Sequence, residues 1–387
     1  MKKILILTPR LSDGGIEKVA SNLSIGMSDV KHNVLALYRT ENTRYDFSTT
    51  SDVLDVRIRS GILGKILSTV ERVLNVRKYI KENNIDVVVS MGETCNIIAM
   101  LSGMKLKKIL TIHSQLSIES KTKGKFGIIQ IIVAKFLYRY AQHIIAVSHV
   151  VKEDAEKLLK VNNISVIYNG HDLNSIRKKS DLDDNLTKKS DAIIVGRITF
   201  AKGHWFLLRA LSKVKQELPE FRLTILGSIE DKEIYTKLLD MVEHFDLGSN
   251  IEFVKYTDNP YPYIKNSKFL VQSSVYEGFP GVVIEALSLG VPVLTTNCGG
   301  ATELITNGLV PSKLSASVYI GDLGVVSKHM GTDILDYQEL TGSEIEFSNS
   351  IIKMMNRDFD KTLLSSTSEN FSLKVMAERY MGIINDI

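Results

Sequence analysis

Short apolar runs alternate with amphipathic segments along the first half of the chain. The apolar runs, each predicted to be a strand, are Ile4–Leu7, Val34–Leu37, Val87–Val89, Ile109–Ile112 and Ile144–Val147. Between them, segments such as Ile66–Lys81 and Lys152–Lys160 have the spacing of amphipathic helices. Continuous apolar strands that alternate with helices are typical of a parallel sheet covered on both faces. The pattern therefore predicts an α/β domain.

A second alternation follows a polar stretch. The residues from Ser180 to Asp191 are mostly polar, and we interpret them as a linker between two domains. Beyond it, the predicted strands are Ala192–Val195, Leu223–Leu226, Phe269–Gln272 and Val291–Leu294. A chain of 387 residues also exceeds what one ordinary core holds. We therefore predict two parallel-sheet domains, residues 1–175 and 190–370, facing a cleft at the carboxyl ends of the strands.

Composition is that of a soluble globular protein, with 44% hydrophobic and 24% charged residues. The two cysteines, Cys95 and Cys298, lie far apart in the sequence and suggest no disulfide framework. No apolar run reaches the roughly 18 residues of a membrane span, and the first one is too short for a signal peptide. The net charge of +4 is unevenly distributed, because residues 1–180 contain 28 Lys and Arg against 16 Asp and Glu. The first half is therefore expected to face something anionic.

Two glycine-containing loops follow predicted strands and open predicted helices. In the first loop, Gly14 and Gly15 would let backbone amides approach an anion at a helix N-terminus, although a paired glycine can also be only a turn. In the second, Arg197 and Lys202 have the chemistry to hold a diphosphate. The alternative is that both side chains are merely solvated on the loop.

The stretch Ser274–Val293 contains two glutamates at the start of a predicted helix. Glu277 follows a predicted strand, and Pro280-Gly281 then begins the helix, so that Val282 and Val283 would offer free amides to a phosphate. Glu285, one turn further on, would accept hydrogen bonds from ribose hydroxyls, and Glu277 from hydroxyls at the other end of the ligand. The alternative is that the two carboxylates only complement the helix dipole.

Taken together, these motifs resemble the retaining glycosyltransferases of family 4, which have the GT-B fold of two Rossmann-like domains. The resemblance rests on Gly14-Gly15-x-Glu17, Gly196-Arg197 with Lys202-Gly203, Glu277 and Glu285 with seven residues between them, and Gly299-Gly300-x-x-Glu303. It covers residues 1 to about 310 and the final helix, and it is nearest to bacterial capsule and O-antigen transferases. Two departures are Gly227-Ser-Ile in place of Gly-x-Gly, and the unfamiliar stretch from Pro311 to Glu344.

The resemblance implies roles for individual residues. Arg197 and Lys202 would hold the donor diphosphate, Glu285 the ribose and Glu277 the transferred sugar. Gly15 would let the backbone approach the phosphate, and the last helix, residues 371–387, would cross back to the first domain. His113, in Thr111-Ile112-His113-Ser114, matches the family histidine near the sugar, although a lone histidine there is often structural.

The resemblance also implies a reaction and partners. The expected activity is transfer of a sugar, with retention, from a UDP- or GDP-sugar to a glycan acceptor, lipid-linked, in cell-surface polysaccharide synthesis. The alternatives are a nucleotide-sugar epimerase or hydrolase of similar fold, or a non-catalytic subunit that binds sugar nucleotides. No divalent metal and no nucleic acid are expected to take part. We interpret Asp181-Leu-Asp183 as a chance Asp-x-Asp pattern rather than a manganese site.

The segment Lys121–Arg139 combines a basic loop with an apolar helix. Either a helix lying on a membrane surface or a crossover helix buried against the sheet has this pattern. The excess of positive charge in the first half favours contact with an anionic membrane. The expected location is therefore cytoplasmic and peripheral, on the inner face of the cell membrane.

Overall fold

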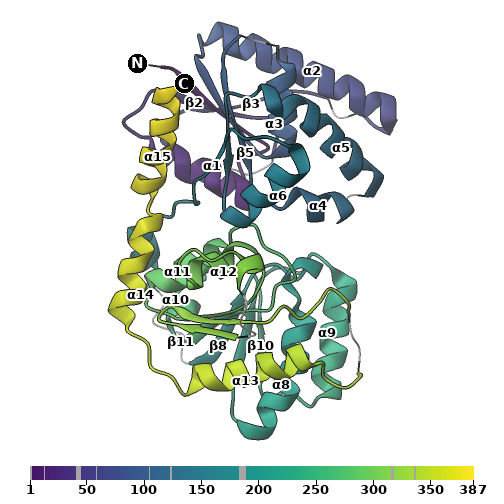
Figure 1. Cartoon of the computed structure of the whole chain (residues 1–387), viewed down its shortest axis with the longest axis vertical. Helices are drawn as coiled ribbons and strands as arrows, with labels where there is room; N and C mark the ends of the chain where they lie inside the picture. The colour runs from purple at the N-terminus through teal and green to yellow at the C-terminus, as the bar shows by residue number, and fades with distance from the viewer. Residues whose placement is uncertain are drawn as a thin grey trace. The chain divides into compact units, whose positions relative to one another are not determined.

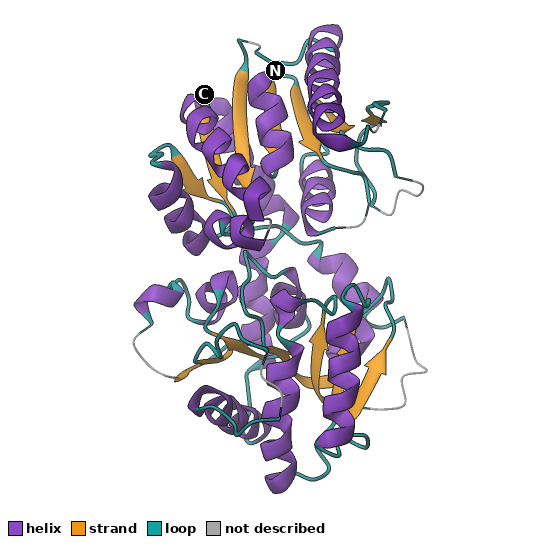
Figure 2. Ribbon diagram, turned by 90° about the vertical axis from the view of Figure 1, so that its right-hand side faces the viewer, coloured by secondary structure: helices purple, strands orange, loops and turns teal. Residues whose placement is uncertain are grey.

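A computed structural model of the chain describes residues 2–12, 14–40, 45–57, 59–103, 105–122, 124–182, 189–314, 318–334 and 337–387. The chain forms two compact units (Figure 1). Unit 1 comprises Met1–His171 and Phe371–Ile387, and unit 2 comprises Asp172–Asn370. In each unit the strands lie between layers of helices (Figure 2).

Unit 1 contains a seven-stranded sheet whose described pairings are all parallel, in the order β3-β2-β1-β4-β5-β6-β7. Its strands are β1 (Ile4–Thr8), β2 (His32–Ala36), β3 (Ser51–Val53), β4 (Val87–Met91), β5 (Lys107–Ile112), β6 (His143–Ala146) and β7 (Ile164–Val166). Its helices are α1 (Gly15–Gly26), α2 (Gly61–Glu82), α3 (Glu93–Leu101), α4 (Leu116–Thr122), α5 (Gly124–Leu137), α6 (His149–Leu159) and α15 (Leu373–Asp386), with the 3-10 turn η1 (Tyr138–Tyr140) after α5.

Strand β1 shows why these apolar runs contain no polar alternation. Ile4 and Ile6 pack into the core on the side of α1 and α15, whereas Leu5 and Leu7 pack into the core on the other side, with residues of α2 and α3. Both faces of the strand are therefore buried, as a parallel sheet between helices requires.

The terminal helix α15 belongs to unit 1. Its buried residues Met376, Ala377, Tyr380 and Ile384 join the same core cluster as residues of α1. The chain returns to unit 1 beside His171, whose amide donates to the carbonyl of Phe371 at 2.8 Å. Helix packing and this backbone pairing together hold the last segment on the first unit.

Unit 2 contains a second seven-stranded sheet, in the order β10-β9-β8-β11-β12-β14-β13, of which only β13 pairs antiparallel among the described strands. Its strands are β8 (Ser190–Val195), β9 (Leu223–Leu226), β10 (Ile251–Val254), β11 (Ser267–Gln272), β12 (Val293–Thr296), β13 (Val318–Gly321) and β14 (Gly324–Ser327). Its helices are α7 (Leu173–Lys179), α8 (His204–Glu217), α9 (Lys232–His244), α10 (Tyr261–Lys265), α11 (Gly281–Ser288), α12 (Gly299–Ile305), α13 (Gly342–Met355) and α14 (Lys361–Ser368), with 3-10 turns η2 (Phe200–Lys202), η3 (Pro311–Lys313) and η4 (Glu369–Phe371).

The boundary between the units differs from the one predicted. It falls between His171 and Asp172, so α7 belongs to unit 2 and the polar stretch from Ser180 to Asp191 lies within that unit. Leu173 and Ile176 of α7 are buried, and Arg177 donates to the carbonyl of Ser288 at the end of α11. These contacts make α7 part of the second core, although it precedes the polar stretch.

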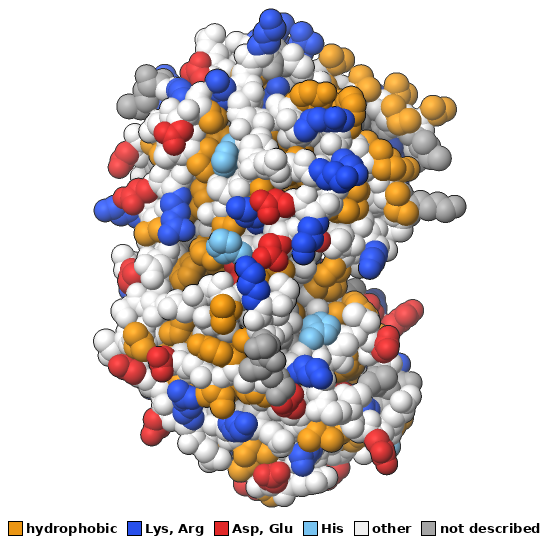
Figure 3. Space-filling view, in the orientation of Figure 1, with side chains coloured by type: hydrophobic (Ala, Val, Ile, Leu, Met, Phe, Trp, Pro, Cys, Tyr) orange, Lys and Arg blue, Asp and Glu red, His pale blue; other side chains and the backbone are white. Residues whose placement is uncertain are grey.

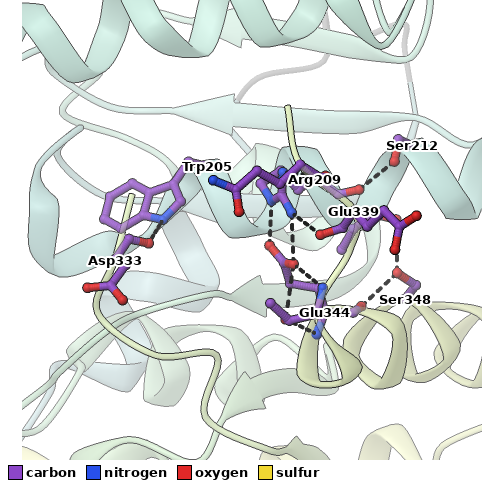
Figure 4. A network of polar contacts seen from close by, with 10 residues as sticks. Trp205, Arg209, Ser212, Asp333, Glu339, Glu344 and Ser348 are labelled. Atoms are coloured by element: carbon purple, nitrogen blue, oxygen red, sulfur yellow. Dashed lines mark hydrogen bonds and ion pairs between the residues drawn. The ribbon is translucent and has the colours of Figure 1, made fainter. Parts of the chain in front are cut away.

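The unfamiliar stretch from Pro311 to Glu344 forms the β13–β14 hairpin and then a segment held on α8 (Figure 4). Trp205 donates its indole N–H to the carbonyl of Asp333 at 3.2 Å. Arg209 and Glu344, both fully buried, form two hydrogen bonds, of 2.6 and 3.1 Å. Arg209 also donates to the carbonyls of Gln338 and Glu339. A buried ion pair thus fixes this segment on the main core helix of unit 2.

Candidate active site

The loop between β8 and α8 carries Lys202 and is fastened to the end of β11. Gly203 has φ of +57°, and a Cβ added there would lie 2.4 Å from the carbonyl oxygen of Ser273. Only glycine permits both this backbone conformation and this approach. Val275 donates its amide to the carbonyl of Ala201 at 2.8 Å, and the Ser273 hydroxyl donates to the carbonyl of Lys202 at 3.0 Å. The two loops therefore hold each other in place at the carboxyl edge of the sheet.

Lys202 and Glu277 meet at this edge. The Lys202 ammonium lies 2.5 Å from Oε1 of Glu277, and the side chains are only 20% and 15% exposed. The Ser274 hydroxyl donates to the same carboxylate oxygen at 3.0 Å. Partial burial strengthens the electrostatic interactions of this pair, and the third polar partner fixes the orientation of the carboxylate. The ammonium has the chemistry to bind phosphate oxygens, and the carboxylate to accept hydrogen bonds from sugar hydroxyls.

Glycines of the following loop position the backbone of Glu277. Gly299, with φ of +60°, would place a Cβ only 1.8 Å from the carbonyl oxygen of Glu277. Gly300 donates its amide to the carbonyl of Gly278 at 3.1 Å. These two glycines, which belong to the family motif, therefore allow close contact with the loop that carries Glu277.

Helix α11 supplies fewer free amides than predicted. Val283 donates its amide to the carbonyl of Pro280 at 3.2 Å, and its side chain is buried. The prediction that Val283 offers a free amide is therefore wrong, because the first turn of the helix closes on itself. Gly281 and Val282 are partly exposed at the helix N-terminus, and Glu285 follows one turn later, also partly exposed.

Arg197 forms an ion pair at the surface of unit 2. Its side chain is 64% exposed, and its guanidinium lies 2.8 Å from a carboxylate oxygen of Glu230, in the loop after β9. Among the described residues, no ion pair or hydrogen bond joins Arg197 to Glu277 or Lys202. Glu230 lies in the loop that begins with Gly227-Ser-Ile, where the sequence departs from the family pattern, and its charge attracts the guanidinium. The structure thus pairs Lys202 with Glu277 and Arg197 with Glu230, and the contact of Arg197 with a diphosphate stays a prediction.

His204 was missed by the sequence reasoning. It is the first residue of α8, fully buried, and neither ring nitrogen has a hydrogen-bond partner within the described part of the chain. Burial lowers its pKa to about 3, and the nearby positive charge of Lys202 contributes in the same direction. A neutral imidazole therefore packs close to the Lys202 ammonium. No local pattern distinguishes such a histidine, because its neighbours Gly203 and Trp205 are typical of any helix start.

In unit 1, Gly14 and Gly15 lie at the start of α1. A Cβ on Gly14 would lie 2.2 Å from Oε2 of Glu17, whose side chain turns back over the helix start. A Cβ on Gly15 would meet no atom within 4 Å. A Cβ at position 14 would therefore displace the end of the flexible Glu17 side chain, whereas a Cβ at position 15 would lie in open space. The role of Gly15 beside a phosphate stays a prediction.

His113 follows β5 and is partly buried. The Thr111 hydroxyl donates to the carbonyl of Ser90 at 2.8 Å, and its oxygen lies 2.7 Å from Nε2 of His113. Because the hydroxyl proton is already used, we assign the imidazole proton to Nε2, which leaves Nδ1 as an acceptor. Burial lowers the pKa of His113 to about 4, against the opposing charge of Glu119. The ring is therefore neutral near pH 7.

The described residues contain no cluster of three or more His, Cys, Asp or Glu side chains placed to hold a metal ion. Asp181 forms an ion pair with Lys265, and Asp183 lies outside the described residues. No helix in the described ranges has the length and apolar character needed to cross a membrane.

Comparison with known proteins places the chain in a family. The model described as Glycosyltransferase Family 4 matches residues 13–175, and that of Glycosyl transferases group 1 matches residues 175–315. An uncharacterized glycosyltransferase of Methanocaldococcus jannaschii is 29% identical over 74% of this chain and 75% of its own length. A 4-alpha-N-acetylgalactosaminyltransferase of Campylobacter jejuni is 27% identical over 79% and 83%.

Solved structures agree on the fold. The Anabaena protein HepE superposes with a TM-score of 0.74 over the full length of both chains, at 18% identity. Its likeness at this identity concerns architecture alone, and the two sheets with interleaved helices described above match the GT-B fold. Together with the two family matches, which span residues 13–315, this shows that the chain is a glycosyltransferase of family 4 type with the GT-B fold.

Proposed function

We propose that the protein transfers a sugar, with retention of anomeric configuration, from a UDP- or GDP-sugar to a lipid-linked glycan acceptor in cell-surface polysaccharide synthesis. The observation that carries this proposal is the Lys202–Glu277 pair at the carboxyl edge of the second sheet. Two relatives support it. The Campylobacter enzyme is named for a diphospho-undecaprenol-linked acceptor, and HepE was solved with UDP and with UDP-glucose.

In the proposed reaction, the bond between the anomeric carbon and the donor phosphate breaks. The acceptor oxygen bonds to that carbon from the same face, and the acceptor proton passes to the leaving phosphate oxygen. Lys202 and the amide of Val282 stabilise the negative charge that develops on the diphosphate. Glu277 holds the hydroxyls of the transferred sugar, and Glu285 holds the ribose.

The resemblance assigns a role to one further residue in each unit. Neutral His113, with Nδ1 unprotonated, accepts a hydrogen bond from a hydroxyl of the transferred sugar. Arg197 reaches the diphosphate only by leaving Glu230. Because both partners of that pair are about half exposed or more, the exchange costs little, as is usual for surface ion pairs.

Product analysis tests the function most directly. The protein would be incubated with UDP- and GDP-sugars, chosen by thermal shift, with and without a glycan acceptor. We expect a new α- or β-glycosidic bond of the donor's own configuration, seen by NMR, only when the acceptor is present. Epimerised or hydrolysed donor at the same rate without acceptor would instead indicate an epimerase or hydrolase. No turnover of any donor that binds would indicate a non-catalytic subunit.

A variant pair connects this activity to the site. Lys202→Met removes the ammonium and should lower kcat/KM by about a hundredfold or more, the scale of losing one preorganised charge-stabilising group. Lys353→Met, an exposed lysine of α13 in the same unit, is the matched control and should be silent. Equal activity of the two variants would show that the Lys202 ammonium has no role in the reaction.

We also propose that transfer needs no divalent cation, since Lys202, Arg197 and the α11 N-terminus offer the positive charge that a leaving diphosphate requires. Activity in excess chelator should stay within about twofold of the untreated level, a change of under 0.5 kcal/mol in barrier. Loss of activity in chelator that manganese restores would contradict this.

We further infer that the protein works in the cytoplasm, bound peripherally to the anionic inner face of the cell membrane. The positive charge of the first half and the exposed apolar face of α5 support this location.

A further inference from the structure

Helix α5 is apolar on both sides. Toward the sheet, its residue Ala134 is buried, as is Tyr138 of the following turn, so α5 is a crossover helix between β5 and β6. On the outer side, Ile128, Ile132 and Phe136 are 59%, 62% and 58% exposed. The crossover expected from the sequence is therefore present, and the same helix also has an apolar outer surface. Contact of that surface with a membrane stays a prediction.

Helix α2 shows the same feature. Its exposed apolar residues recur at helical spacing on one side, and they are Leu63, Ile66, Leu67, Val70 and Leu74. Val76 and Ile80 are buried on the opposite side. Hydrophobic side chains gather over α2 and α5 at the upper right of Figure 3, with lysines and arginines beside them. Exposed apolar patches of this kind mark surfaces that bind a partner.

A basic hollow lies at the amino edge of the same sheet, the edge opposite to the one that carries Gly15 and His113. It has a volume of about 880 Å³ and is lined by four lysines, Lys2, Lys105, Lys107 and Lys108. We call it the lysine hollow. Lys105 and Lys107 are exposed, and neither forms an ion pair with a described carboxylate. Asp86, the one carboxylate in the lining, accepts a hydrogen bond from the amide of Lys3 at 2.8 Å. The Lys2 ammonium donates to the carbonyl of Ile384 at 2.6 Å, and Lys108 is buried. The positive charge that the hollow offers to a ligand is therefore that of Lys105 and Lys107.

Tyr140 joins the lysine hollow to the apolar face of α5. It lines the hollow and is itself 60% exposed. Its ring packs edge-on against Phe136, with 6.1 Å between centroids. The Arg139 guanidinium lies over both rings, 4.7 Å from the centroid of Phe136 and 5.5 Å from that of Tyr140. An apolar surface, an aromatic border and a cationic hollow thus follow one another without interruption.

We propose that the lysine hollow binds the phosphate headgroup of an anionic membrane lipid while the outer face of α5 enters the acyl region of the bilayer. The proposal rests on the membrane partner of the proposed function and adds a headgroup site to it. Apolar side chains bordered by Lys and Arg are typical of surfaces that lie in the bilayer interface. Protein interfaces, by contrast, are depleted in lysine at their centres, which makes a soluble protein the poorer occupant.

Vesicle sedimentation tests the headgroup site. The vesicles would contain phosphatidylcholine alone or with 30% phosphatidylglycerol, a composition chosen as about the charge of a bacterial inner leaflet. We expect wild type to bind the anionic vesicles selectively. Each lysine near an anionic surface is worth about a fivefold change in affinity. The double variant Lys105→Glu/Lys107→Glu should therefore bind at least about 25-fold more weakly.

Matched controls separate charge from position. Lys232→Glu/Lys353→Glu makes the same change in net charge on exposed lysines of unit 2 and should bind within about twofold of wild type. Ile128→Gln/Ile132→Gln should weaken binding by about tenfold or more through lost apolar contact, whereas Leu363→Gln, on α14, should not. Equal losses in the two lysine pairs, or no loss at Lys105 and Lys107, would overturn the headgroup site.

Two further outcomes identify other occupants. Displacement from vesicles by millimolar inorganic phosphate, beyond that caused by chloride of equal ionic strength, would show that the hollow takes a soluble phosphate instead of a lipid. Binding to neither vesicle type would overturn the lipid assignment and leave a protein as the occupant of the apolar face. Transfer to a lipid-linked glycan acceptor dispersed in detergent, without vesicles, is measured on the same variants and should be unchanged. No transfer by wild type in this assay would contradict the proposed function and leave the result on vesicle binding unaffected.

Discussion

The ammonium of Lys202 and the carboxylate of Glu277 each neutralise the other in this structure. A nucleotide sugar brings groups of the opposite kind to both, with phosphate oxygens for the ammonium and hydroxyls for the carboxylate. The pair therefore keeps two charged side chains oriented and partly desolvated before the donor arrives, which lowers the cost of reorganisation during the reaction. In the proposed reaction, Ser274, which hydrogen-bonds Glu277, holds the carboxylate when the ammonium turns toward phosphate.

Gly15 offers a test in which folding and binding are separable. Gly15→Ala adds a methyl group that meets no atom within 4 Å, at a helical position where alanine is favoured. We expect unchanged stability but a fall in kcat/KM of about tenfold or more, because the methyl group holds the phosphate away from the backbone. The readouts are thermal unfolding and initial rates at low donor concentration. Gly248→Ala, also in open space, is the control in unit 2. Full activity of Gly15→Ala would show that Gly14-Gly15 is only a turn and does not contact the phosphate.

At the scale of loops and helices, the close contact between Gly299 and the backbone of Glu277 predicts that a larger residue at position 299 lowers activity. Gly299→Ala must move the Glu277 backbone, since the new Cβ would lie 1.8 Å from its carbonyl oxygen. A displacement of about 1 Å at a catalytic group is sufficient to lower kcat/KM by about a hundredfold. Gly124→Ala is the matched control, because its φ of +58° is nearly the same but nothing lies within 4 Å.

Both variants should lose about 1–2 kcal/mol of stability from the left-handed conformation alone. Only Gly299→Ala should lose activity as well. If the two variants were equally active, the close approach of Gly299 would have no part in positioning Glu277.

The buried ion pair of Arg209 and Glu344 joins α8 to the start of α13, and the stability of unit 2 should depend on it. Arg209→Met leaves the Glu344 carboxylate buried without its ion-pair partner and should lower the free energy of unfolding by about 3–5 kcal/mol. Glu344 also accepts from the amide of Thr341 in a capping box at the start of α13, a bond that glutamine can keep. The double variant Arg209→Met/Glu344→Gln should therefore be more stable than the single variant. Urea unfolding of the set measures this, and a single variant that loses under about 1 kcal/mol would show that the pair is not isolated from water.

For the whole molecule, the sequence predicted the elements that have strong local signals. The central strands β1, β4, β5, β8 and β11 were predicted because both of their faces are buried, which leaves continuous apolar runs. The strands that were missed have three or four residues and lie at a sheet edge or next to one, and they are β3, β7, β10, β13 and β14. Edge strands mix polar with apolar residues and lack that signal.

The site was predictable where it is local and not where it depends on distant residues. Lys202, Glu277 and Gly299 lie in or at the end of the loops that follow β8, β11 and β12, so their place at the carboxyl edge could be predicted from the order of elements. The orientation of the Arg197 side chain depends on Glu230. The position of the stretch before α13 depends on the ion pair between Arg209 and Glu344, which are 135 residues apart. Contacts over such separations have no local pattern. The unit boundary was misplaced for the same reason, since α7 packs on residues far along the chain.

Each unit contains a buried histidine whose titration links stability to pH. Burial lowers the pKa of His171 in unit 1 to about 4 and that of His204 in unit 2 to about 3. In the unfolded chain both titrate near 6.5, so below that pH the unfolded state binds protons that the folded state does not. As far as these two histidines are concerned, the free energy of unfolding is therefore greatest above about pH 6.5. It decreases as the pH is lowered toward the pKa values of the folded state.

Between pH 7 and pH 5, each of these histidines should remove about 2 kcal/mol from the free energy of unfolding of its own unit. His204→Leu deletes the titrating group from the core of unit 2 and should make that unit's stability nearly independent of pH over this range, apart from the carboxylates. Calorimetry at the two pH values on wild type and His204→Leu measures the difference directly. A variant that loses as much stability on acidification as wild type would show that His204 is already protonated, and hence hydrated, in the folded protein.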